Sequence, residues 1–121
     1  MKMVMAGAVR FSRVCLDALV ALRAPLCGVI SLPPGKAARH SDYADLSVPA
    51  RAAGVEAFET DDINSDATLA TLRRWGPDVL LILGWSQLLK PPLLRVPRMG
   101  SVGSHPALLP KNRGRHPIVW Q

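Results

Sequence analysis

Short continuous runs of hydrophobic residues alternate along this chain with longer stretches in which apolar residues recur at helical spacing. Continuous Val, Leu and Ile runs are typical of strands covered on both faces, as in a parallel sheet. The segments at 2–7, 26–32 and 78–84 are of this kind. A weaker strand is expected at 55–59, and a glycine-rich strand at 100–105.

The segments between these runs predict helices. In residues 11–23, apolar side chains recur every three or four positions, and Ser12 is the candidate N-cap. Asn64 or Ser65 is expected to cap a helix that ends before Gly76. The remaining expectations are a short helix at 48–54, a helical turn at 86–90, an irregular link at 91–97 and a helix that begins at Pro117.

This alternation of strands and helices predicts one α/β domain with a Rossmann-like parallel sheet, strand order 3-2-1-4-5 and helices on both faces. Ligands of such sheets bind beyond the carboxyl ends of the strands, beside the point where the strand order reverses. Four predicted features lie at that edge and are expected to form one crevice: Gly7, the loop at 33–47, Gly84 with Trp85, and His105.

The positive charge of the chain is concentrated in its last third. The formal net charge is +6, and residues 79–121 contain six Lys or Arg residues and no Asp or Glu. Such a block indicates an anionic partner, which could be a phosphate, a polycarboxylate or a nucleic acid; a solvated basic face is the other interpretation. No apolar run approaches the roughly 18 residues of a membrane span. We therefore expect a cytoplasmic protein with no membrane partner.

Candidate functional residues lie at and after the ends of the predicted strands. The turn "GAVRFS" after the first strand has one glycine where a dinucleotide site needs three, which argues against NAD, although Gly7 still permits close approach of a ligand. His105, with Gly103 nearby, could act as a general acid or base. The "LLPKNRGR" loop suits anion capture by guanidinium groups. No metal is expected, since His105 has no partner at ligand spacing, and Cys15 and Cys27 are expected to be buried thiols.

The segment "SHPALLPKNRGRHPIVW" resembles the signature of the formyltransferases that use 10-formyltetrahydrofolate, which act on methionyl-tRNA, glycinamide ribonucleotide or amino sugars. His105 matches the family histidine, residues 108–110 match the loop on the folate side, and Arg113-Gly114 match its continuation. The segment "PDVLLILGWSQLL" is similar to the family's strand and turn before the site. The resemblance covers essentially the whole chain.

This resemblance implies that a primary amine attacks the formyl carbon of 10-formyltetrahydrofolate and forms a tetrahedral oxyanion. It makes His105 the catalytic residue. The residues that it places at the folate donor are Trp85, Gln87, Leu108, Leu109 and Pro110. The residues that it places at the substrate or its anionic group are Gly7, Arg113, Gly114 and Arg115.

Two departures from the family pattern bear on activity. Gly103 stands where the family has an asparagine near the oxyanion, and no acid follows Asp78 to serve as the family's downstream aspartate. Asp42 and Asp45 lie at the same edge of the predicted sheet and are substitutes to consider. We therefore expect residues 1–121 to be the N-terminal portion of a single formyltransferase catalytic domain, incomplete at the C-terminus and inactive alone.

The acceptor is expected to be an amino-sugar nucleotide, because "RGRHPIVW" is more similar to the pattern of the sugar enzymes than to that of the tRNA enzymes. Four alternatives stay open. They are a methionyl-tRNA formyltransferase, a formyltetrahydrofolate hydrolase, an inactive folate- or nucleotide-binding remnant, and a nucleic-acid-binding domain that uses the basic last third.

Overall fold

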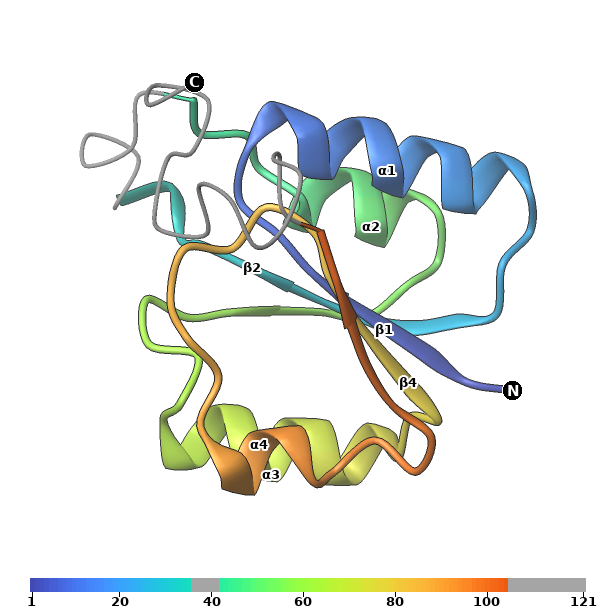
Figure 1. The fold of residues 1–121 in the computed structure, drawn as a ribbon. Helices are drawn as coiled ribbons and strands as arrows, with labels where there is room; N and C mark the ends of the chain where they lie inside the picture. The colour runs from blue at the N-terminus through green and yellow to red at the C-terminus, as the bar shows by residue number, and fades with distance from the viewer. Residues whose placement is uncertain (36–41, 105–121) are drawn as a thin grey trace.

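The computed structural model describes residues 1–35 and 42–104, which form a parallel sheet between two layers of helices (Figure 1). All neighbouring strands are parallel, and the order β3-β2-β1-β4-β5 confirms the predicted one. In chain order the elements are β1 (Met3–Ala6), α1 (Arg10–Ala21), β2 (Leu26–Ser31), α2 (Ser47–Ala52), β3 (Ala57–Glu59), α3 (Asp66–Trp75), β4 (Val79–Ile82), α4 (Pro91–Leu94) and β5 (Gly100–Gly103).

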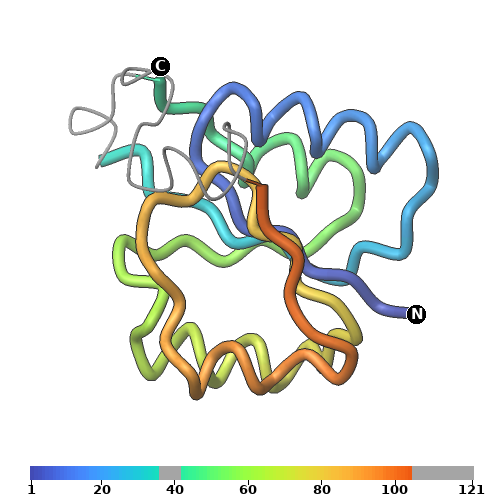
Figure 2. The backbone as a smooth tube through the Cα atoms, in the orientation of Figure 1, coloured from blue at the N-terminus to red at the C-terminus, as the bar shows by residue number. Residues whose placement is uncertain are grey.

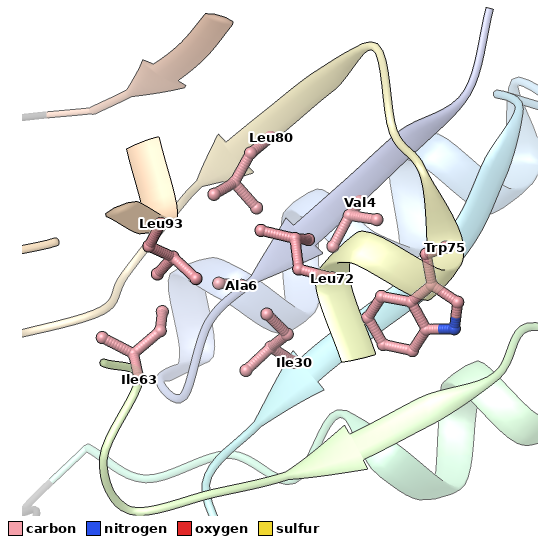
Figure 3. Packing of buried hydrophobic residues seen from close by; sticks show 8 residues of the cluster. All are labelled: Val4, Ala6, Ile30, Ile63, Leu72, Trp75, Leu80 and Leu93. Carbon is pink, nitrogen blue, oxygen red and sulfur yellow. The ribbon is translucent and has the colours of Figure 1, made fainter. Parts of the chain in front are cut away.

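The core lies on both faces of the sheet, because successive residues of a strand point to opposite sides. On one face, Val4 and Ala6 pack under α3 and α4 (Figure 3). On the other face, Met5 packs under α1 and α2. The first layer is formed by Val4, Ala6, Ile30, Ile63, Leu72, Trp75, Leu80 and Leu93. The second is formed by Met5, Leu16, Val29, Leu46 and Ala50.

The helix that follows β1 begins earlier than the sequence predicts. Its first residue is Arg10 and its N-cap is Val9, so Ser12 lies in the first turn and is not the N-cap. The prediction was wrong because the Ser12 hydroxyl reaches back from inside the helix and accepts a hydrogen bond from the backbone N–H of Val9 (3.2 Å). By contrast, Ser65 does cap α3 by accepting from Thr68 N.

The connection between β4 and β5 also differs from the expectation. Residues 86–90 form no helix, and the expected irregular link contains α4, which begins at Pro91. Proline favours the first position of a helix because its φ is already helical and its missing N–H would have no partner there. Figure 2 traces the extended segment that leads from β4 to this helix. The expected helix at Pro117 lies outside the described residues.

Within residues 1–35 and 42–104, no helix is long and apolar enough to cross a membrane. The same part of the chain holds no group of three or more His, Cys, Asp or Glu side chains that could bind a metal ion.

Gly28 of β2 is required by the helix packed over it. A Cβ atom at this position would lie 2.5 Å from the indole ring of Trp75. We predict that Gly28→Ala lowers the free energy of unfolding by about 1–3 kcal/mol, because the ring or the strand must shift to relieve the overlap. Urea denaturation measures the change. Gly35→Ala is the matched control, since a Cβ there meets nothing within 4 Å; equal effects of the two variants would contradict the prediction.

Candidate active site

A small cavity lies at the carboxyl edge of the sheet, beside the ends of β1 and β4. Its volume is about 60 Å³, roughly that of two water molecules in the liquid. After β1 the chain passes to the face covered by α1, and after β4 it passes to the face covered by α4, so the strand order reverses here. In the described part of the chain, the lining consists of Ala8, Val9, Leu32, Asp61, Gly84, Trp85, Ser86 and Gln87.

The turn between β1 and α1 forms one wall of the cavity. The backbone N–H groups at the start of this turn donate hydrogen bonds to other parts of the protein. The N–H of Gly7 donates to Ile30 O, and the N–H of Ala8 donates to Gly84 O (both 3.1 Å). These two N–H groups are therefore already bonded within the protein.

Gly7 is needed for packing at this turn. A Cβ atom at Gly7 would lie 2.5 Å from Ser12 Oγ and 2.6 Å from Leu83 O. The absent side chain thus makes room for α1 and for the end of β4. The role of Gly7 beside a substrate anion stays a prediction.

Trp85 and Gln87, the two described residues assigned to the folate side, come together on the opposite wall. Gln87 Oε1 accepts hydrogen bonds from Trp85 Nε1 (3.2 Å) and from Ile63 N (2.8 Å). Gln87 Nε2 donates to Asp61 O (2.9 Å). The amide thus orients the indole and ties it to the loop after β3. Contact of either residue with folate remains a prediction.

Asn64, in the loop after β3, also bonds to the segment after β4. The sequence did not reveal this role. Its Nδ2 donates to Leu88 O (2.9 Å), and its Oδ1 accepts from Lys90 N (2.8 Å). The pattern suggested Asn64 only as a cap for α3. Its actual partners lie more than 20 residues away and could not be inferred from local spacing. Together Gln87 and Asn64 hold the segment after β4 against the loop that carries Asp61.

The two carboxylates considered as substitutes for the family aspartate already have partners. Arg10 Nε lies 3.1 Å from Asp42 Oδ1. Asp45 accepts hydrogen bonds from the first N–H groups of α2, at Ser47 and Val48 (both 3.1 Å). Asp45, which directly precedes the N-cap residue Leu46, therefore already serves as the acceptor for the start of α2.

β5 brings the chain to the same edge. Gly103 pairs with Ile82, and Ser104 N donates to Ile82 O (3.3 Å), so the chain leaves β5 next to the end of β4. A Cβ atom at Gly103 would make ordinary contacts, the nearest at 3.6 Å from Ile82 O. The predicted site residues His105, Leu108, Leu109, Pro110, Arg113, Gly114 and Arg115 lie outside the described residues.

Part of the basic last third lies away from the cavity. Arg95 and Arg98 follow α4 and precede β5, at the amino edge away from the cavity, where Arg98 Nε lies 2.9 Å from Asp78 Oδ1. Arg95 and Arg73 line a separate open hollow of about 270 Å³ between the ends of α3 and α4. Arg95 and Arg98 therefore do not serve the predicted crevice, and Lys111, Arg113 and Arg115 lie outside the described residues.

The two cysteines are half-buried, whereas the sequence predicts buried thiols. Burial raises the pKa of the Cys15 and Cys27 thiols. A raised pKa disfavours the thiolate, which is the nucleophilic form. Both residues act as packing residues in the two core layers, where Cys27 contacts one cluster and Cys15 the other.

The chain matches the formyl transferase family over residues 2–121 and belongs to that family. It is 29% identical to the methionyl-tRNA formyltransferase of Agathobacter rectalis, over 99% of this chain and 39% of that protein. It is 33% identical to the methionyl-tRNA formyltransferase of Cyanothece sp., over 99% of this chain and 37% of that protein. It thus spans less than half the length of these curated relatives.

The fold also matches solved structures. The phosphoribosylglycinamide formyltransferase of Bacillus halodurans superimposes with a TM-score of 0.76 at 18% identity, over 99% of this chain and 63% of that one. The enzyme of the same name from Anaplasma phagocytophilum gives a TM-score of 0.74 at 19% identity, over 99% and 56%. At these identities the likeness establishes the Rossmann-like fold alone.

Gln87 is predicted to hold the Trp85 indole in place. Gln87→Ala removes the acceptor of both the indole N–H and Ile63 N, so we expect a shift of the Trp85 indole signal in a ¹H–¹⁵N NMR spectrum. We also expect a loss of about 1 kcal/mol in unfolding free energy. Ser86→Ala, which shortens an exposed neighbour on the same cavity, is the control. An unchanged indole signal in Gln87→Ala would show that the bond is not formed.

Proposed function

We propose that the protein containing this chain transfers a formyl group from 10-formyltetrahydrofolate to a primary amine, and that residues 1–121 form the N-terminal portion of its single catalytic domain. Family membership over residues 2–121 carries the proposal. The cavity supports it, because it lies at the carboxyl edge where β5 leads toward His105.

The cavity fits the reacting group of such a donor. Its volume of about 60 Å³ is enough for a formyl group and an attacking nitrogen. The rest of the donor then contacts residues beyond the described part of the chain, with Leu108, Leu109 and Pro110 as the proposed folate loop. When bound, the folate supplies the formyl carbon that the amine attacks.

The chain's own residues then act on the charge that develops during the attack. We assign to His105 the stabilisation of the oxyanion and a part in moving the proton of the amine. Trp85, oriented by Gln87, forms a flat wall against the reacting group. Gly103 offers no side-chain donor at the position where the family has an asparagine. Asp42 and Asp45 already have partners, which makes them the weaker candidates for the carboxylate partner of His105.

Methionyl-tRNA is the acceptor that we propose first. The support comes from the curated relatives, which are named as methionyl-tRNA formyltransferases. An amino-sugar nucleotide is the second candidate, and the observation that favours it is the "RGRHPIVW" segment. Glycinamide ribonucleotide is the third candidate, and its only support is the fold that this chain shares with a phosphoribosylglycinamide formyltransferase.

The test is an assay of the full-length protein with 10-formyltetrahydrofolate and each of the three amines in parallel. We expect methionyl-tRNA to be formylated, with a KM that rises steeply with salt because tRNA binding releases counterions. A preference for an amino-sugar nucleotide would overturn the choice of acceptor. Formate release without an amine would indicate a hydrolase, and folate binding without turnover would indicate an inactive remnant.

His105 is predicted to be essential for the transfer. In the full-length protein, His105→Ala should lower kcat by about 10²–10³-fold, the usual loss for one stabilising group at an oxyanion. The KM for the folate donor should change much less, because the histidine acts in the transition state. Added imidazole should restore part of the rate. A variant with full activity would remove His105 from the mechanism.

At Gly103 we predict a substitution that raises the rate of transfer. Gly103→Asn should raise kcat, because it adds the missing amide donor at a position where a Cβ atom meets only ordinary contacts. Gly103→Ala is the matched control, since it adds a Cβ atom without a donor. Equal rates for wild type and both variants would contradict the proposed oxyanion role of this position.

A further inference from the structure

The hydroxyl of Ser12 connects the two walls of the cavity. Ser12 lies in the first turn of α1 and is 0% exposed. Its Oγ accepts hydrogen bonds from Ala8 N (3.1 Å) and Val9 N (3.2 Å) and donates one to Leu83 O (2.5 Å). One hydroxyl group therefore uses its single donor and both acceptor sites on the backbone.

These three partners belong to different parts of the site. Ala8 and Val9 line the cavity on the side of the turn after β1. Leu83 directly precedes Gly84 and Trp85, which line it on the side of β4. The two segments are about 75 residues apart in sequence, and Ser12 sets their separation through a buried, fully bonded contact.

The surrounding backbone is shaped around this hydroxyl. A Cβ atom at Gly7 would lie 2.5 Å from Ser12 Oγ. A Cβ atom at Gly84 would overlap the same oxygen and lie 2.6 Å from Val9 Cγ2. Gly84 also has φ +86°, a conformation that residues with a side chain rarely adopt. Two glycines thus give the hydroxyl room between the two walls.

We propose that Ser12 is a positioning residue of this cavity, which fixes the turn at residues 8–9 against the segment at 83–85 and thereby sets the width of the space for the reacting groups. The proposal rests on the proposed formyl transfer. Ser12 is buried and acts through Ala8, Val9 and Leu83. Its effect therefore falls on ligand binding, while the chemical step depends on the residues beyond β5.

The two amide groups that Ser12 accepts from differ in a way that a measurement can use. Ala8 N also donates to Gly84 O (3.1 Å), so it keeps a partner when the hydroxyl is removed. Within the described part of the chain, the acceptor for Val9 N is Ser12 Oγ. Removal of the hydroxyl should therefore expose Val9 N–H to exchange much more than Ala8 N–H.

The test compares Ser12→Ala with Ser47→Ala in the full-length protein. Ser47 is a matched control, because it is also a buried serine (1% exposed) but its hydroxyl has no hydrogen-bond partner in the described part of the chain. By NMR-detected hydrogen exchange, Ser12→Ala should speed exchange at Val9 about tenfold, the equivalent of one hydrogen bond, and affect Ala8 less. Unchanged protection of Met5 and Val29 shows that the fold is intact.

Kinetics then separate positioning from a purely structural role. Ser12→Ala should raise the KM for 10-formyltetrahydrofolate about tenfold with kcat within about twofold, while Ser47→Ala changes neither constant. Unchanged exchange at Val9, or faster exchange with an unchanged KM, would overturn the positioning role. A wild-type protein without formyl transfer would overturn the proposed function instead, and exchange at Val9 would still show whether Ser12 joins the two walls.

Discussion

The burial of β1 on both faces is the constraint on which the rest of the structure depends. Val4, Met5 and Ala6 are each 0% exposed, and β1 is hydrogen-bonded to a parallel strand on either side. A strand placed in this way needs helices over both faces of the sheet and parallel neighbours that end at the same edge. The turn that starts at Gly7 is therefore forced to lie beside the segment that follows β4.

The site follows from that placement. Because the chain leaves β1 and β4 toward opposite faces, the two connections separate and leave a small cavity at the edge. Polar side chains then set its dimensions. The buried Ser12 joins the two walls through their backbone, and Gln87 and Asn64 hold the outer wall against the loop after β3. All three are bonded to backbone groups, so they define the shape of the site and leave the chemistry to His105 and to residues farther along the chain.

The strands and their order could be predicted because continuous apolar runs and the alternation of elements are local signals. The features that the sequence predicted wrongly or missed depend on contacts between residues far apart in the chain. Serine is a typical N-cap residue, but the Ser12 hydroxyl donates to Leu83 O, just after the neighbouring strand β4 and far away in sequence. Gln87 could be placed at the site, whereas its bonds to residues 61–63 could not be foreseen. For His105 and the loop after it, resemblance to the family remains the basis of the assignment.

The most direct test of the account is to map where 10-formyltetrahydrofolate binds, by hydrogen exchange of the full-length protein with and without the donor. The account predicts new protection at residues 8–9 and 84–87, at the carboxyl edge of the sheet. Protection confined to the amino edge, around the hollow lined by Arg73 and Arg95, would contradict it, as would a protein whose exchange is unchanged at saturating donor.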